Sequence, residues 1–187
     1  MSHFFAYISR MKLIQRWGLM RNTQTENIQE HSLQVAMVAH TLAVVRNRLY
    51  GGNVDPERVV TLAIFHDCSE VITGDLPTPI KNFNSKIVTA YKEIEHLACE
   101  RIYNMLPEEL RDEYHDIFFP AEKDAEHWKL VKAADKLCAY LKCLEELQAG
   151  NNGFLKAERA VMSSLMKMNM PEVTYFVENF SPSFSLT

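Results

Sequence analysis

Residues 59–70 read VVTLAIFHDCSE, an apolar run that ends in adjacent histidine and aspartate side chains. A His-Asp pair at the end of a buried run is costly unless another group pairs with it. Imidazole and carboxylate together suit a first-row divalent cation. If the stretch is one helix, Ala63, His66 and Glu70 share a face, because residues three and four apart line up. Glu70 then lies beside the cation without ligating it, where it can handle a proton of the reacting water.

Two further polar residues lie inside helical patterns elsewhere in the chain. His31 opens a series of apolar residues at helical spacing, which places it on the inward face of an amphipathic helix. Asp135 lies within residues 130–139, LVKAADKLCA, where an unpaired aspartate is unfavourable both for helix propensity and for burial. The pattern predicts that three apolar helices bring these residues together with His66 and Asp67 at one metal site. The alternative is a set of core polar groups that satisfy one another without a metal.

Composition excludes several classes of protein. A chain of 187 residues suits one domain with one sizeable core, and its formal net charge of -4 offers no basic field for a nucleic-acid polymer. No apolar run approaches the roughly 20 residues that span a bilayer, and the first residues lack the pattern of a signal peptide. The four cysteines form no Cys-x-x-Cys pair. We therefore expect reduced thiols, a cytoplasmic location and no membrane partner.

Helical periodicity accounts for nearly the whole chain. Asn27 and Glu30 have the spacing of a capping box, and two prolines make residues 74–79 a loop. We expect the tail, residues 181–187, to be extended. The expected helices span residues 3–14, 28–49, 56 to the His-Asp motif, 84–105, 108–118, 122–148, 154–168 and 171–180. With no strand pattern or linker, the sequence predicts one all-α domain over residues 1–187, with the metal site between core helices.

The predicted metal site indicates a reaction. Two histidines and two carboxylates leave coordination positions open on a metal that prefers five or six ligands, which is the layout of a catalytic site. Phosphate esters are suitable substrates, because their hydrolysis depends mainly on positioning and on neutralising charge. Arg16 is a candidate for binding phosphate, and Trp17 beside it could orient the ester. Taken singly, Arg16 is more simply a surface charge and Trp17 a core or interface aromatic.

Five motifs sharpen this interpretation. They are RW at 16–17, EHSLQVA at 30–36, HDCSE at 66–70, TGDLPTP at 73–79 and ADKLCAYLKCLEEL at 134–147. Together they resemble the bacterial HD-domain 5′-deoxynucleotidases, and the resemblance runs over nearly the whole chain. It implies the helical HD-domain fold and the hydrolysis of 2′-deoxyribonucleoside 5′-monophosphates to deoxynucleoside and phosphate, with little preference for the base.

The resemblance also implies residue roles, carried over position by position. The metal would be held by His31, His66, Asp67 and Asp135. Glu70 would position or deprotonate the attacking water, with Asp67, Arg16 and Trp17 as further catalytic residues. The residues that would contact the substrate are Arg16, Trp17, His31, Asp67, Asp75, Leu76, Pro77, Thr78 and Asp135.

Cofactor and assembly follow from the same resemblance. It implies activation by divalent cobalt, with manganese or copper as other options, and a homodimer. A rigid loop with two prolines can exclude a ribose 2′-hydroxyl by steric clash, which predicts selection against ribonucleotides. An apolar face with Val161, Leu165 and Met168 is either a dimer interface or core.

Two alternatives remain open at this stage. One is another HD-domain activity, such as a phosphodiesterase or a triphosphohydrolase, although the chain has no evident basic pocket for a triphosphate. The other is a non-catalytic helical interaction module in which the metal is structural. Such a closed site would have no need of Glu70 or Arg16.

Overall fold

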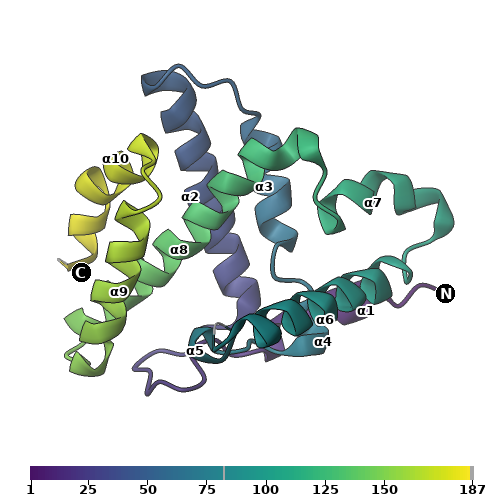
Figure 1. Cartoon of the computed structure of the whole chain (residues 1–187), viewed down its shortest axis with the longest axis horizontal. Coiled ribbons are helices and arrows are strands. Elements are labelled where there is room, and N and C mark those ends of the chain that lie inside the picture. Colours follow the sequence, from purple (N-terminus) through teal and green to yellow (C-terminus); the bar gives the residue numbers. More distant parts are fainter. Residues whose placement is uncertain (82, 186–187) are drawn as a thin grey trace.

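Three helices form the centre of the structure, namely α2 (Ile28–Leu49), α3 (Pro56–Phe65) and α8 (Ala125–Gln148). In this computed structural model, which describes residues 1–81 and 83–185, each of the three packs against the other two (Figure 1). Their facing sides are apolar and fully buried, and removing this surface from water is the main contribution to stability. The site residues lie on or next to these three helices, so the core also fixes the site.

Local capping sets where the central helices begin. The side chain of Asn27 accepts hydrogen bonds from the backbone amides of Gln29 and Glu30, and the Glu30 carboxylate accepts one from the amide of Asn27. This is the predicted capping box. At the start of α3 the Asp55 side chain accepts hydrogen bonds from the backbone amides of Glu57 and Arg58, ahead of Pro56 in the first turn.

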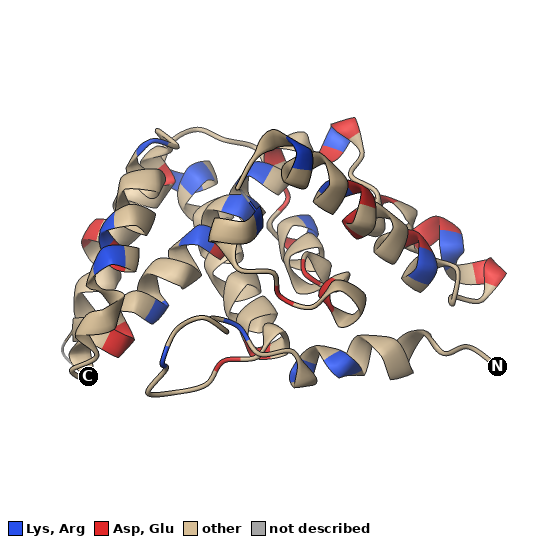
Figure 2. Ribbon diagram, turned by 60° about the horizontal axis from the view of Figure 1, so that its bottom comes forward, with Lys and Arg blue, Asp and Glu red and all other residues tan. Residues whose placement is uncertain are grey.

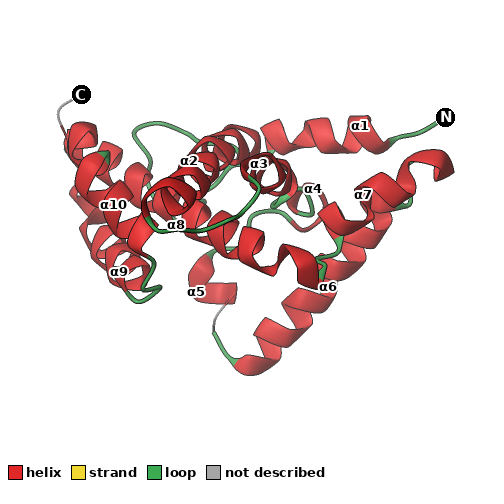
Figure 3. Cartoon of the chain, turned by 90° about the horizontal axis from the view of Figure 1, so that it is seen from above, coloured by secondary structure: helices red, strands yellow, loops and turns green. Residues whose placement is uncertain are grey.

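The remaining helices cover the two ends of this centre (Figure 1). They are α1 (Phe4–Ile8), α4 (Glu70–Thr73), α5 (Thr78–Lys81), α6 (Ser85–Tyr103), α7 (Arg111–Phe118), α9 (Leu155–Met166) and α10 (Pro171–Asn179). Helices α9 and α10 lie at one end, and α1, α6 and α7 at the other. Short 3-10 segments lie between them at Ser9–Leu13, Glu108–Leu110, Glu122–Asp124 and Asn152–Phe154, and another, Ser181–Ser185, follows α10. Figure 3 shows helices and loops only, which confirms the predicted all-α class for the described residues.

The structure corrects several expected boundaries. The first α-helix ends at Ile8, and residues 9–13 continue as a 3-10 helix that keeps Met11 buried. Helix α3 ends at Phe65, so residues 66–69 form turns and do not continue the helix to Glu70. The expected loop at 74–79 is shorter, because α5 begins at Thr78. Apolar spacing does not distinguish an α-helix from a 3-10 helix or a short run of turns, and a pair of prolines does not mark where the next helix begins, so the sequence pattern reveals none of these differences.

The expected extended tail is also wrong where it is described. Residues 181–185 form a 3-10 helix packed against α8. Ser181 is buried and Phe184 packs against the main core, so apolar burial orders this segment. Residues 186–187 of that tail lie outside the described residues. The face with Val161, Leu165 and Met168 belongs to the same core, which decides that alternative.

The surface agrees with the composition. Figure 2 shows basic and acidic residues interspersed over the helices in that view. None of the helices within residues 1–81 and 83–185 combines the length and the apolar character that crossing a bilayer requires. All four cysteines are free thiols, as expected.

Candidate metal centre and adjoining cavity

Three side chains at the centre of the fold could hold a metal ion. His31 lies in the first turns of α2, and His66 and Asp67 lie in the turn that follows α3. One ligand atom from each falls within 4.8 Å of the other two. The contact between α2 and α3 brings together residues that are 35 positions apart in the sequence, as His31 and His66 are. The predicted meeting of these three groups is therefore found.

The hydrogen bonds of His66 favour a cation. Its Nδ1 lies 2.7 Å from the carbonyl oxygen of Ala63, an acceptor, so Nδ1 carries the proton and the lone pair is on Nε2. That Nε2 is buried and makes no hydrogen bond, although Asp67 Oδ2 lies 3.1 Å away. Burial opposes a charged imidazole, yet the charge of Asp67 raises the pKa of His66 to about 9. The surroundings of His66 Nε2 thus favour a positive charge at this nitrogen. A metal ion would supply that charge in place of a proton.

Asp135, on α8, joins the same cluster through His31. Its Oδ1 lies 3.0 Å from His31 Nε2, and Asp67 Oδ2 lies 3.6 Å from that same nitrogen. Asp135 is not one of the three mutually close groups, and its side chain is 43% exposed. It therefore stands at the open side of the cluster, where a ligand to the metal could also face the substrate.

Arg16 is held inside the site and is not a solvated surface charge. Its side chain is only 12% exposed, with Nη1 3.6 Å from Asp67 Oδ2 and Nε 3.3 Å from Glu26 Oε2. The segment carrying it folds back on itself, since the amide of Arg16 donates to the carbonyl of Glu26 at 2.9 Å. The other oxygen of Glu26 lies 3.5 Å from His31 Nδ1. Glu26 thus links the guanidinium to the first histidine of the cluster.

Trp17 combines packing with an unpaired donor. Its ring lies 5.3 Å from that of Phe154, so it is part of an aromatic contact, as the simpler interpretation expected. Its backbone has a φ of 60°, a left-handed conformation that a non-glycine residue adopts only at some cost in free energy. Its indole Nε1 is buried and donates to no group among the described residues. A strained residue with a free N–H next to Arg16 is suited to contact a ligand.

Glu70 opens α4 beside the cluster and is almost fully buried, with 4% of its side chain exposed. One carboxylate oxygen, Oε1, accepts from Lys81 Nζ at 3.2 Å. The other, Oε2, is buried without a hydrogen bond. Burial raises the pKa of Glu70 to about 8, the charge of Asp67 adds to this, and Lys81 opposes it. A carboxyl group with such a pKa can both take and return a proton near neutral pH.

The loop from Asp75 to Thr78 follows α4 directly in the sequence, after Gly74. Gly74 has a φ of 72° and turns the chain out of α4, a conformation that favours glycine. Asp75 is close enough for its charge to act on both Arg16 and Glu70. Leu76 and Pro77 are partly exposed and Thr78 is exposed. The structure therefore places this loop beside the predicted site residues.

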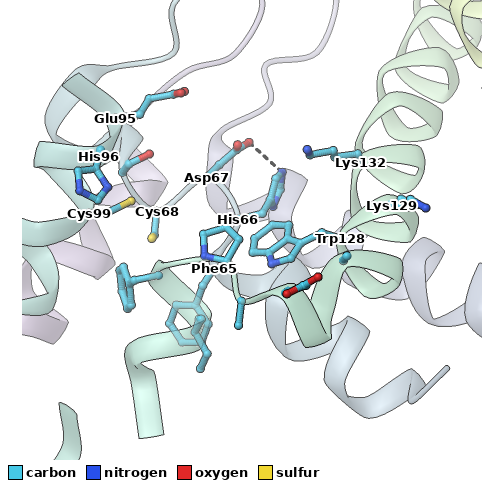
Figure 4. Close-up of a pocket in the computed structure, with 17 residues that line it drawn as sticks. Phe65, His66, Asp67, Cys68, Glu95, His96, Cys99, Trp128, Lys129 and Lys132 are labelled. Carbon is cyan, nitrogen blue, oxygen red and sulfur yellow. Dashed lines mark ion pairs between the residues drawn. The ribbon is translucent and has the colours of Figure 1, made fainter. Parts of the chain in front are cut away.

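A cavity of about 600 Å³ opens on another side of the cluster, where His66 and Asp67 form part of its wall (Figure 4). Figure 4 shows Lys132 of α8 extending toward these two residues, with Glu95 of α6 across the opening. Trp128 and Phe65 supply apolar surface. The loop of Asp75 to Thr78 does not contribute to its described walls.

Reasoning from the sequence missed two polar partners, Glu26 and Lys81. Neither contact lies within one helix: Glu26 and Arg16 are ten positions apart in a loop, and Lys81 and Glu70 are eleven positions apart on two separate helices. A loop closure fixes the first pair and the short helix α5 fixes the second. Neither has a signal in a periodicity pattern.

The fold defines the class of protein. A structure described as an HD-domain phosphohydrolase from Listeria innocua matches 99% of this chain and 89% of its own, with a TM-score of 0.85 and 22% identity. The cyanophage S-2L HD phosphohydrolase DatZ, solved with dA and one catalytic Zn²⁺, matches 95% of this chain and 96% of its own, with a TM-score of 0.68 and 17% identity. The chain therefore has the fold of the HD-domain phosphohydrolases, as expected.

The family follows from the sequence comparison. The family model described as 5′-deoxynucleotidase YfbR-like matches residues 3–184. The 5′-deoxynucleotidase YfbR of Shigella dysenteriae serotype 1 and the 5′-deoxynucleotidase of Cronobacter sakazakii are each 56% identical over 186 residues, covering 100% of this chain and 94% of theirs. The chain belongs to the YfbR-like family of 5′-deoxynucleotidases, which confirms the predicted resemblance.

Proposed function

We propose that this protein is a metal-dependent phosphomonoesterase that hydrolyses 2′-deoxyribonucleoside 5′-monophosphates to deoxynucleoside and phosphate. The observation that carries the proposal is the buried cluster of His31, His66 and Asp67 with Glu70 beside it, in a chain of this family. We further propose that residues 1–187 act as one catalytic domain.

In this proposal His31, His66, Asp67 and Asp135 hold the divalent cation. When bound, the cation neutralises charge on the phosphoryl oxygens and makes water a better nucleophile. We take cobalt as the most effective ion in vitro, with manganese or copper as alternatives. The donor set of two imidazoles and two carboxylates is compatible with all three ions.

The chain's own residues bind the ester and move the proton. Arg16 and Trp17 contact the phosphate, and the guanidinium matches its geometry. Glu70 takes a proton from the attacking water as the oxygen of that water bonds to phosphorus. The bond between phosphorus and the sugar's 5′-oxygen breaks, and the proton held by Glu70 passes to that leaving oxygen. Both functions fit a carboxyl group with a raised pKa.

We assign the loop residues Asp75, Leu76, Pro77 and Thr78 to the nucleoside. Backbone held by two prolines cannot easily yield to an additional 2′-hydroxyl, which supports selection against ribonucleotides. Equal turnover of AMP and dAMP would show that the loop is no such filter.

We propose a homodimer and a cytoplasmic location. Leu33 and Met37 lie on successive turns of α2 and are 60% and 58% exposed, so they form an apolar surface that a second copy could cover. The four free thiols suit a reducing compartment. Sedimentation of the wild type and of a Met37→Glu variant tests the dimer, since the variant should sediment as a monomer.

The direct test of the mechanism is Glu70→Gln. We expect this variant to bind the metal with wild-type stoichiometry and to lose turnover of dAMP by about 10²- to 10⁴-fold, the usual contribution of a general acid or base. Wild-type turnover in the variant would remove Glu70 from the chemistry. If the wild-type protein binds metal but hydrolyses no nucleotide, the result would instead support the alternative of a non-catalytic interaction module with a structural metal.

A further inference from the structure

The ion pair between Lys81 and Glu70 closes a loop of the chain. Lys81 ends α5 and Glu70 begins α4, and the segment between them contains the two prolines of residues 77 and 79. Lys81 Nζ donates to Glu70 Oε1 at 3.2 Å and lies 4.9 Å from the centre of the Tyr91 ring. The ammonium thus joins the far end of the loop both to Glu70 and to α6.

The two partners differ in their exposure. The Lys81 side chain is 28% exposed, whereas that of Glu70 is 4% exposed. A buried carboxylate with a cation on one oxygen has its orientation fixed, because rotation would break a charge-assisted hydrogen bond. The second oxygen, Oε2, makes no hydrogen bond and remains free for the reacting water.

The charges around Glu70 make this cation important. The acidic groups that act on it are Asp67, in the turn before α4, and Asp75, in the loop after it. On α6, Tyr91 and Glu95 face Lys81. Among these neighbours, Lys81 is the one that donates a hydrogen bond to the Glu70 carboxylate.

We propose that Lys81 is a positioning residue for catalysis: it fixes one carboxylate oxygen of Glu70 and couples the orientation of that carboxylate to the position of the 75–78 loop. The proposal rests on the proposed function, because Glu70 must handle the proton of the attacking water. Lys81 acts through Glu70, so its effect is on kcat and not on KM or on metal binding.

The test compares Lys81→Met and Lys81→Arg with the wild type, using saturating metal and a range of dAMP concentrations. The methionine removes the ammonium donor while keeping most of the stem. We expect kcat for Lys81→Met to fall by about tenfold or more while KM for dAMP changes by less than about twofold, because Glu70 acts in the chemical step and not in substrate binding. Lys81→Arg, which can still donate to Glu70, should restore most of the wild-type kcat.

A matched control and a second readout separate this role from a structural one. Lys86→Met changes an exposed lysine on the next helix and should leave kcat and KM unchanged. Metal stoichiometry should be the same in all variants, and their unfolding temperatures should agree within about 3 °C. A Lys81→Met variant that folds and binds metal normally, yet keeps the wild-type kcat, overturns the proposal. Absence of dAMP turnover in the wild type would instead refute the proposed function.

Discussion

Replacing Glu146 should destabilise the protein strongly, although this residue is distant in sequence from every predicted site residue except Asp135. Glu146 lies on α8 and is 1% exposed. Its carboxylate accepts from Lys142 Nζ at 2.6 Å, from the Thr23 amide at 2.9 Å and from Asn151 Nδ2 at 2.8 Å. Lys142 also donates to the carbonyl of Gln24 at 2.7 Å. The network fastens residues 21–24, in the loop that carries Arg16, Trp17 and Glu26, to the central helix.

The magnitude follows from burial. Glu146→Leu leaves the ammonium of Lys142, itself 6% exposed, without its partner. Breaking a buried pair in this way typically lowers the free energy of unfolding by about 3–5 kcal/mol. For a chain of this size each kcal/mol shifts Tm by about 2–4 °C, so Tm should fall by about 6–20 °C.

Thermal and urea unfolding followed by circular dichroism measure this effect. Glu145→Leu, at the exposed neighbouring position, is the control and should change the free energy by less than about 0.5 kcal/mol. In the double variant Lys142→Met with Glu146→Leu, the loss should be smaller than the sum of the single losses, because no unpaired charge remains. A loss below about 1 kcal/mol in Glu146→Leu, or strictly additive losses, would refute the reasoning.

Two further outcomes follow from the same contacts. Glu26→Gln should weaken metal binding about 10- to 100-fold in calorimetry, because Glu26 supports His31, and equal affinity would contradict that role. The stability that Glu146 contributes should be lost in acid. Burial opposes the ionisation of Glu146, but hydrogen bonds from Lys142 and others lower its pKa to about 2. The contribution is therefore complete above the ordinary glutamate pKa near 4.5 and disappears as the pH falls toward 2. Unfolding free energies of wild type and Glu146→Leu should therefore converge over that interval; a constant difference would show that folding does not lower the pKa of Glu146.

Local signals in the sequence predicted the fold well. The capping box at Asn27 and the Asp55-Pro56 start act within one turn, so the pattern and the structure agree. The tail from Ser181 could not be predicted in this way. Its 3-10 helix depends on burial of Phe184 against distant helices, which overrides the preference of a segment rich in serine and proline.

The candidate site likewise contains some residues that local sequence patterns predict and others that depend on contacts between distant segments. Its His and Asp residues were visible, because a polar group on an apolar helix face is conspicuous in the sequence. Glu26 and Lys81 were not, because each takes its role from loop closure that brings it to a partner. The 600 Å³ cavity depends on three separate stretches of the chain, residues 65–69, 95–99 and 117–132, and has no sequence pattern at all.

The most direct test of the central claim is the release of phosphate from dAMP and AMP by metal-stripped protein, with Co²⁺, Mn²⁺, Mg²⁺ or Zn²⁺ added back singly. Parallel reactions with dATP and bis(p-nitrophenyl) phosphate test triphosphates and diesters. We expect metal-dependent release of phosphate from dAMP, with little from AMP. Turnover of only the diester or the triphosphate, or no turnover with any of these metals, would contradict the assignment as a 5′-deoxynucleotidase.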